Sequence, residues 1–157
     1  MRIAKLLFIL LSLLITLGGC EKKKPTTELR DVHWDRDMCE RCKMVTSDRH
    51  HSVQVINPAN GKSYMFDDIG CTLLWFDDEK IEWRDKAKIW ITDAHTGKWI
   101  DAREAFYDSD SITPMAYGIA AHALRSDIKD GAEVLHFKDL HSIIVKIEEK
   151  INNRKPN

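Results

Sequence analysis

The sequence predicts an α+β fold, made of two related strand–strand–helix–strand halves followed by a C-terminal helix. Three observations lead to this prediction. Extended segments occur in pairs around turn-forming residues, as they do in antiparallel hairpins. Apolar residues at helical spacing follow these pairs. Strands and helices do not alternate one by one along the chain, as they would in a doubly wound parallel sheet.

The first half contains a predicted hairpin, a helix and a third strand. Residues 52–56 and 63–66 are extended segments separated by the turn-forming sequence Asn-Pro-Ala-Asn-Gly. Asp67 and Asp68 are suitable caps for the helix that follows. The apolar stripe of this helix consists of Ile69, Leu73, Leu74 and Phe76. Residues 87–92 form the next predicted strand.

The second half repeats this order. Residues 98–101 and 105–107 are short extended segments. Thr113 is a suitable N-cap followed by proline, which predicts a helix over residues 113–126. Residues 133–137 then form a strand after an Asp-Gly turn. A last helix has an apolar stripe of Leu140, Ile143, Ile144, Ile147 and Ile151.

The N-terminus has the pattern of a bacterial signal peptide. Arg2 and Lys5 supply positive charge, and residues 6–17 are an almost unbroken apolar run that is too short to span a bilayer. The run closes on Leu-Gly-Gly before Cys20, which resembles the lipobox of bacterial lipoproteins. We therefore expect residues 1–19 to be removed and Cys20 to carry lipid. The alternative is an ordinary signal anchor, which the lack of a second apolar stretch disfavours.

The mature chain is expected to divide into a lipidated tether, residues 20–30, and one domain, residues 31–157. Glu21 follows the lipidated cysteine, which favours the outer membrane over the inner one as the site of anchoring at the periplasmic face. Loss of Arg2 and Lys5 lowers the 24 basic residues to 22, against 25 acidic ones. This negative balance disfavours nucleic acid as a partner, because the phosphates need a basic surface.

With Cys20 lipidated, three thiols remain, and an odd number in an oxidising compartment leaves at least one unpaired. Cys39 and Cys42 can converge across a turn, and Cys42 and Met44 point the same way if the segment is extended. Thiolate and thioether ligands together favour a soft ion, above all Cu(I). The third thiol, Cys71, is interpreted as a small core residue of the first predicted helix.

Three other interpretations of the Cys39 and Cys42 pair stay open. A structural disulfide suits an oxidising compartment. Zinc would need two further ligands, which Cys71 and a histidine could supply. A thiol oxidoreductase would place the pair after an apolar strand and at the start of a helix, whereas the flanking residues here are polar.

One more methionine and three histidines are weighed as ligands. Met115 lies in the first turn of the second predicted helix and is a candidate closing ligand, with core packing as the alternative. His122 lies on the same helical face but about 10 Å farther along the axis, too far to share one ion. His50 and His51 closely follow the cysteine motif, and we interpret them as part of a solvated turn.

The order of these motifs resembles the NosL family of copper-binding lipoproteins, which are accessory proteins of nitrous-oxide reductase. Family members usually have glycine between the second cysteine and the methionine, where this chain has Lys43. The matching segments are the lipobox at Cys20, Cys39-Glu40-Arg41-Cys42-Lys43-Met44, Phe66-Asp67-Asp68-Ile69-Gly70-Cys71, Ile100-Asp101-Ala102-Arg103-Glu104-Ala105-Phe106-Tyr107, and Thr113-Pro114-Met115-Ala116-Tyr117-Gly118.

The resemblance implies a chaperone that binds one Cu(I) and supplies it to an apo copper enzyme, nitrous-oxide reductase. It also implies a fold of two related halves, similar to that of organomercurial lyase, without implying catalysis. We therefore predict a lipid-anchored Cu(I) carrier and not an enzyme. Cys42 and Met44 are the first predicted ligands, Cys39 is the next, and Met115 closes the site. A thiol oxidoreductase and a zinc-binding lipoprotein are the alternatives.

Overall fold

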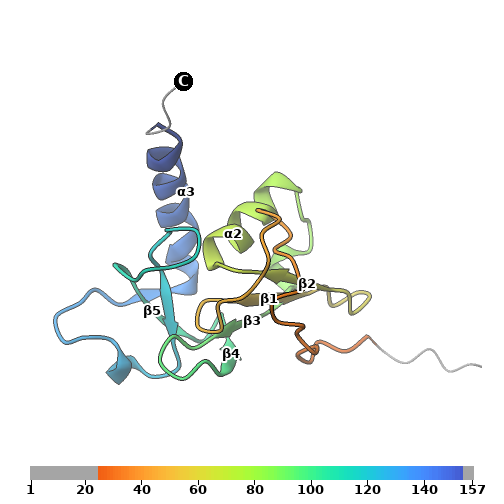
Figure 1. The fold of residues 1–157 in the computed structure, drawn as a ribbon, viewed down its shortest axis with the longest axis horizontal. Helices are drawn as coiled ribbons and strands as arrows, with labels where there is room; N and C mark the ends of the chain where they lie inside the picture. Colours follow the sequence, from red (N-terminus) through yellow and green to blue (C-terminus); the bar gives the residue numbers. More distant parts are fainter. Residues whose placement is uncertain (1–24, 154–157) are drawn as a thin grey trace, which may run out of the picture.

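The computed structural model describes residues 25–153, which form two antiparallel sheets and two α-helices (Figure 1). The first sheet has the strand order β2-β1-β3-β4. Its strands are β1 (Val53–Ile56), β2 (Ser63–Phe66), β3 (Lys88–Thr92) and β4 (Trp99–Asp101). β1 pairs with β2 on one side and β3 on the other, so Val53 lies between Phe66 and Ile91. Every residue of β1 is buried, as expected for a central strand.

The second sheet repeats this arrangement on a smaller scale. Its strands are β5 (Phe106–Asp108), β6 (Ala120–His122) and β7 (Leu135–His136), in the order β6-β5-β7. In each half, the first strand of the half therefore lies between the second and the third, and all pairings are antiparallel. The α+β class is confirmed, and the two sheets correspond to two related halves. The strand predicted over residues 98–101 as the start of the second half is wrong in its placement, because it forms β4 and pairs with β3 at the edge of the first sheet.

The helical elements are α2 (Ile69–Asp78), α3 (Phe137–Asn153) and the short 3-10 turns η1 (Arg84–Lys86) and η2 (Arg125–Asp127). Residues 69–76 of α2 are all buried, because the helix packs against β1 and β2 and also against α3 (Figure 1). The longer α3 is amphipathic and buries Leu140 and Ile144. The predicted C-terminal helix is thus confirmed, although it begins at Phe137, inside the segment predicted as a strand.

The helix predicted over residues 113–126 is wrong. The structure places a turn, the strand β6 and η2 there. The hydroxyl of Thr113 does not cap a helix of its own, because it donates a hydrogen bond to the Asp68 carboxylate at 2.6 Å. Ala116 and Gly118 then adopt left-handed backbone angles, with φ of 60° and 74°, which end any helical path. The segment is the connection between β5 and β6.

A close contact fixes this connection against α2. Tyr117 is 3% exposed, and its ring lies directly over Gly70 in the first turn of α2. An ideal Cβ at Gly70 would lie only 2.2 Å from the Tyr117 ring. Glycine is therefore needed here for close approach rather than for an unusual backbone angle.

We expect Gly70→Ala to lower the free energy of unfolding by about 1–3 kcal/mol, the usual effect of overpacking a core. Helix propensity alone gives the opposite sign, because alanine is about 1 kcal/mol better than glycine inside a helix. Urea unfolding of the two proteins therefore separates the effects. A more stable Gly70→Ala protein would show that the Tyr117 ring does not confine this position.

The predicted signal peptide and Cys20 lie outside the described residues. The last residues of the predicted tether lie on the first sheet, where the Trp90 indole donates to the Thr27 carbonyl at 3.2 Å. The Arg30 amide donates to the Gln54 side chain at 2.7 Å. Within residues 25–153, neither helix combines the length and the apolar character that a membrane span requires.

Candidate metal centre

The Cys39 to Met44 segment forms the tip of a hairpin. Met38 and Val45 pair as an antiparallel bridge, and the Cys39 amide donates to the Met44 carbonyl at 2.8 Å. Cys39 and Met44 are therefore cross-strand neighbours, although Cys39 is fully buried and Met44 is 52% exposed. Lys43 closes the turn by donating its amide to the Cys39 carbonyl at 3.0 Å.

The position at which the chain departs from the NosL pattern has an unusual backbone angle. Lys43 has a φ of 61°, in the left-handed region that glycine adopts without steric cost. A glycine there suits the same turn, so the departure keeps the loop path at the expense of some strain. The Lys43 ammonium lies 3.2 Å from the Glu40 carboxylate, which holds the lysine side chain on the outside of the turn.

Arg41, between the two cysteines, fixes the hairpin tip to the rest of the domain. Its guanidinium donates to Asp78 at the end of α2 at 2.8 Å and to Glu148 of α3 at 3.0 Å. A third hydrogen bond, at 2.9 Å, reaches the Tyr117 hydroxyl. The side chain is only 21% exposed, so these charge-assisted bonds are shielded from water. The loop that carries Cys39 and Cys42 is therefore held in place by the Arg41 hydrogen bonds.

Four potential ligands converge where this loop meets the start of α2. The sulfur atoms of Cys39, Cys42 and Cys71 and a carboxylate oxygen of Asp67 all lie within 4.8 Å of one another. Asp67 follows β2 directly, and Cys71 is one helical turn further on. Cys42 lies 3.4 Å from the nearer Asp67 oxygen. All three thiols are unpaired, so the structure contains no Cys39–Cys42 disulfide.

Burial and mutual hydrogen bonding separate the pKa values of the three thiols. Cys71 donates a hydrogen bond to Cys39, which lowers the pKa of Cys39 to about 7. The same bond, together with burial, raises the pKa of Cys71 well above its usual range. Burial raises the pKa of Cys42 to about 12. At neutral pH the cluster thus carries one readily formed thiolate and two protonated thiols, so a metal that binds all three must displace protons.

The predicted ligands Cys39 and Cys42 lie together in the cluster. Met44 is 52% exposed, and its amide donates to the Cys42 sulfur. The Met115 amide lies 3.4 Å from the Asp68 carboxylate, next in sequence to Asp67, and the side chain packs against the core. A role for either thioether as a ligand stays a prediction.

The histidines near the motif have partners of their own. His50 lies with its ring 2.9 Å from the Ala94 carbonyl, and the His51 ring lies 3.2 Å from Asp48. His122 lies on β6, not on a helix; its Nε2 is 3.2 Å from the Asp108 carboxylate, but within the described chain neither ring nitrogen makes a hydrogen bond. None of the three belongs to the thiol and carboxylate cluster.

Sequence reasoning missed Asp67 as part of the site and included Cys71 only in the zinc alternative. Both occur in a segment that the family resemblance includes, but Asp67 was interpreted as a helix cap and Cys71 as core. Both are indeed buried, at 2% and 0% exposure. Their spacing of four residues at the start of a predicted helix was the available signal, because it places two side chains on one face. The approach of the hairpin to that face depends on tertiary contacts.

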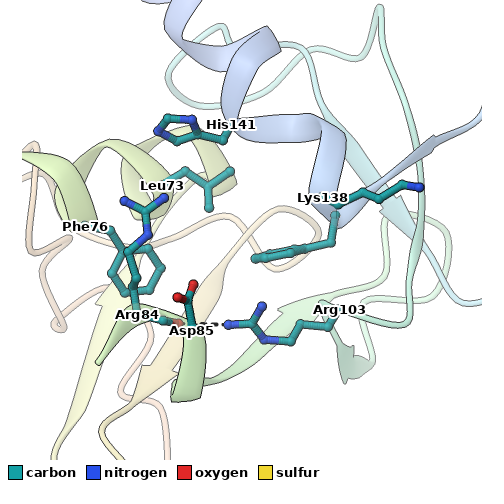
Figure 2. A pocket seen from close by; sticks show the side chains of 8 residues that line it. Leu73, Phe76, Arg84, Asp85, Arg103, Lys138 and His141 are labelled. Carbon is teal, nitrogen blue, oxygen red and sulfur yellow. Dashed lines mark hydrogen bonds between the residues drawn. The ribbon is translucent and has the colours of Figure 1, made fainter. Parts of the chain in front are cut away.

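Two hollows lie near these elements. A cleft of about 520 Å³ reaches Cys39 from outside and is also lined by Met38, Glu40, Lys43 and Met65. A second, of about 290 Å³, lies between α2, η1 and the start of α3 (Figure 2). Its charged rim combines Arg84, Asp85 and Arg103, and its lining contains no sulfur. Only the first hollow adjoins the cluster.

Comparison with known proteins identifies a shared fold. No family model and no curated protein matches this sequence. Among solved structures, the chain is similar to the crystal structure of the copper chaperone NosL from Shewanella denitrificans, with a TM-score of 0.61. The match covers 73% of this chain and 96% of that one, at 14% sequence identity. The chain therefore has a NosL-like fold.

Proposed function

We propose that this protein binds Cu(I) at the Cys39, Cys42 and Cys71 cluster and carries it to a copper enzyme. One observation supports this most strongly: three unpaired thiols and one carboxylate meet within 4.8 Å. Thiolates are soft ligands and prefer Cu(I), whereas hard cations such as Mg²⁺ and Ca²⁺ prefer oxygen. The donor set therefore suits copper as the cargo, in agreement with the similarity of the fold to a copper chaperone.

The burial of the site suits a carrier. Cys39 and Cys71 are fully buried, which protects a bound ion from water, whereas Cys42 is partly exposed. An incoming ligand can therefore reach the ion first from the Cys42 side. Met44 is the cross-strand neighbour of Cys39 and is half exposed, so its thioether is available to act as a weak ligand during entry or release.

Zinc is the second candidate, and the geometry favours it more than the sequence did. Four donors that lie close together could surround an ion completely, as structural zinc sites do. Zinc also binds thiolates and carboxylates together. Such a site would make the protein a zinc-binding lipoprotein rather than a copper carrier.

A thiol oxidoreductase has less support. Its attacking thiol must be both exposed and low in pKa. Here Cys39, whose pKa is lowered to about 7, is fully buried. Cys42 is partly exposed, but its pKa is raised to about 12 by burial. The two requirements fall on different residues.

The location and the client complete the proposal. The lipobox-like sequence before Cys20 supports a lipid anchor at the periplasmic face of a bacterial membrane, with the outer membrane favoured by Glu21. The motif resemblance supports nitrous-oxide reductase as the copper acceptor.

An anaerobic titration tests the metal. The reduced full chain should bind one equivalent of Cu(I), and Cu(I) should displace previously bound Zn(II), because soft thiolates prefer the softer ion. Bound metal is measured by elemental analysis after removal of excess ion. Stoichiometric zinc that Cu(I) cannot displace would instead establish the zinc alternative.

A further inference from the structure

Exposed apolar side chains are concentrated on the hairpin that carries two of the thiols. Among residues 25–153, the large exposed hydrophobic side chains include Met38, Met44 and Val45, at 52%, 52% and 48% exposure. Met38 and Val45 form the antiparallel bridge, so they lie directly opposite each other. A cluster of exposed apolar side chains on a small domain commonly marks an interaction surface.

The cleft beside this hairpin gives the surface a charge and borders the thiol cluster at Cys39. Cys39 lines the cleft, and so do three carboxylates, those of Asp31, Asp37 and Glu40. The Glu40 charge is balanced by Lys43 at 3.2 Å. Within the described chain, Asp31 has no basic partner, and Asp37 has only the exposed ring of His33, at 3.5 Å. The cleft is thus acidic on the side that opens next to the exposed methionines.

We propose that the Met38, Met44 and Val45 surface and the adjoining acidic cleft form the docking site for the copper acceptor, and that the acceptor presents a basic segment carrying a sulfur ligand. This inference rests on the proposed function. Charge complementarity selects a basic partner, because carboxylates with little neutralisation attract Lys and Arg. The exposed thioethers select a sulfur donor that can share Cu(I) with them during ligand exchange.

The rigidity of the hairpin also fits docking. Arg41 anchors its tip to α2, α3 and Tyr117, so the apolar surface and the thiols keep a fixed relation to each other. A partner that covers Met38 and Val45 therefore brings its own ligand to the same place each time. Preformed surfaces of this kind lose little conformational freedom on binding.

Two short peptides test the inference. Both contain one cysteine and one methionine, flanked by lysines in one peptide and by glutamates in the other. The full chain is first loaded with one equivalent of Cu(I), and the initial rate of copper transfer to each peptide is measured without oxygen. At low ionic strength, the lysine peptide should accept copper at least about tenfold faster, and high salt should remove most of this difference.

Variants assign the preference to this surface. Asp31→Asn with Asp37→Asn should reduce the lysine preference to about twofold or less, whereas the matched control, Asp127→Asn with Asp130→Asn near η2, should keep it. Met38→Ser should slow transfer to both peptides. Thermal unfolding and copper loading confirm that each variant is folded and competent.

The outcomes separate the two proposals. If the wild-type chain does not load Cu(I), the proposed function fails before any peptide is added. If the chain loads normally but transfers equally fast to both peptides, or if the control and the cleft variant behave alike, the docking site is wrong and the copper site stands. Faster transfer to the glutamate peptide would overturn the charge assignment directly.

Discussion

Replacing Cys71 by serine should weaken Cu(I) binding at least about 100-fold. Even residues that only support metal ligands commonly cost 10- to 100-fold in affinity, and a lost thiolate ligand should cost at least as much. Cys71 was not among the copper ligands predicted from the sequence, yet its sulfur lies within 4.8 Å of those of Cys39 and Cys42. Competition with a Cu(I) chelator, without oxygen, measures the change. Cys42→Ser should have an effect of similar size.

Met44→Leu is the matched comparison for the Cys71 result. Leucine is close to methionine in volume, so the swap should change the free energy of unfolding by less than about 1.5 kcal/mol. It should lower Cu(I) affinity less than Cys71→Ser does, because Met44 is half exposed. If Cys71→Ser kept the wild-type affinity for Cu(I) and Met44→Leu lost much of it, the three-thiol site would be wrong. The Cys42 thiol and Met44 thioether predicted from the sequence would then be the ligands.

Cys20→Ala should abolish lipid attachment. This cysteine carries the whole of the proposed lipid signal, so the variant chain should be either unprocessed or freely soluble. When cells are grown with labelled palmitate, the label should be incorporated into the wild-type chain and not into the variant. Cys71→Ser is the control, because it removes a thiol from the folded domain and should leave the label unchanged. Palmitate in Cys20→Ala at the wild-type level would contradict the lipoprotein assignment.

Local signals were sufficient for most of the fold. Two of these signals act over only a few positions: the turn-forming residues between β1 and β2, and the Asp68 cap of α2. The hairpin and the helix can therefore be predicted from the sequence alone. The false helix over residues 113–126 had good local signals too. Thr113 bonds to Asp68 instead, and Ala116 and Gly118 turn the backbone away from a helix. A tertiary partner overrode local preference there.

Only the part of the site that depends on local structure could be predicted from the sequence. Cys39 and Cys42 are close in sequence, and a turn was enough to bring them together. Asp67 and Cys71 join them through tertiary contacts: Arg41 ties the hairpin to α2, α3 and the connection between β5 and β6, and the Glu40 amide donates to the Met65 carbonyl of β2 at 2.8 Å. Cys71 was correctly expected to be buried, but burial in a helix and a place in a cluster of ligands proved compatible.

X-ray absorption at the copper edge tests the central claim most directly. The full chain, loaded with one equivalent of Cu(I) and kept anaerobic, should show an edge typical of Cu(I) and a first coordination shell dominated by sulfur. The sulfur count should fall in Cys71→Ser, because a serine hydroxyl is a hard and poor ligand for this ion. A shell of nitrogen and oxygen donors, or a sulfur shell identical in wild type and Cys71→Ser, would contradict a copper site built on the three converging thiols.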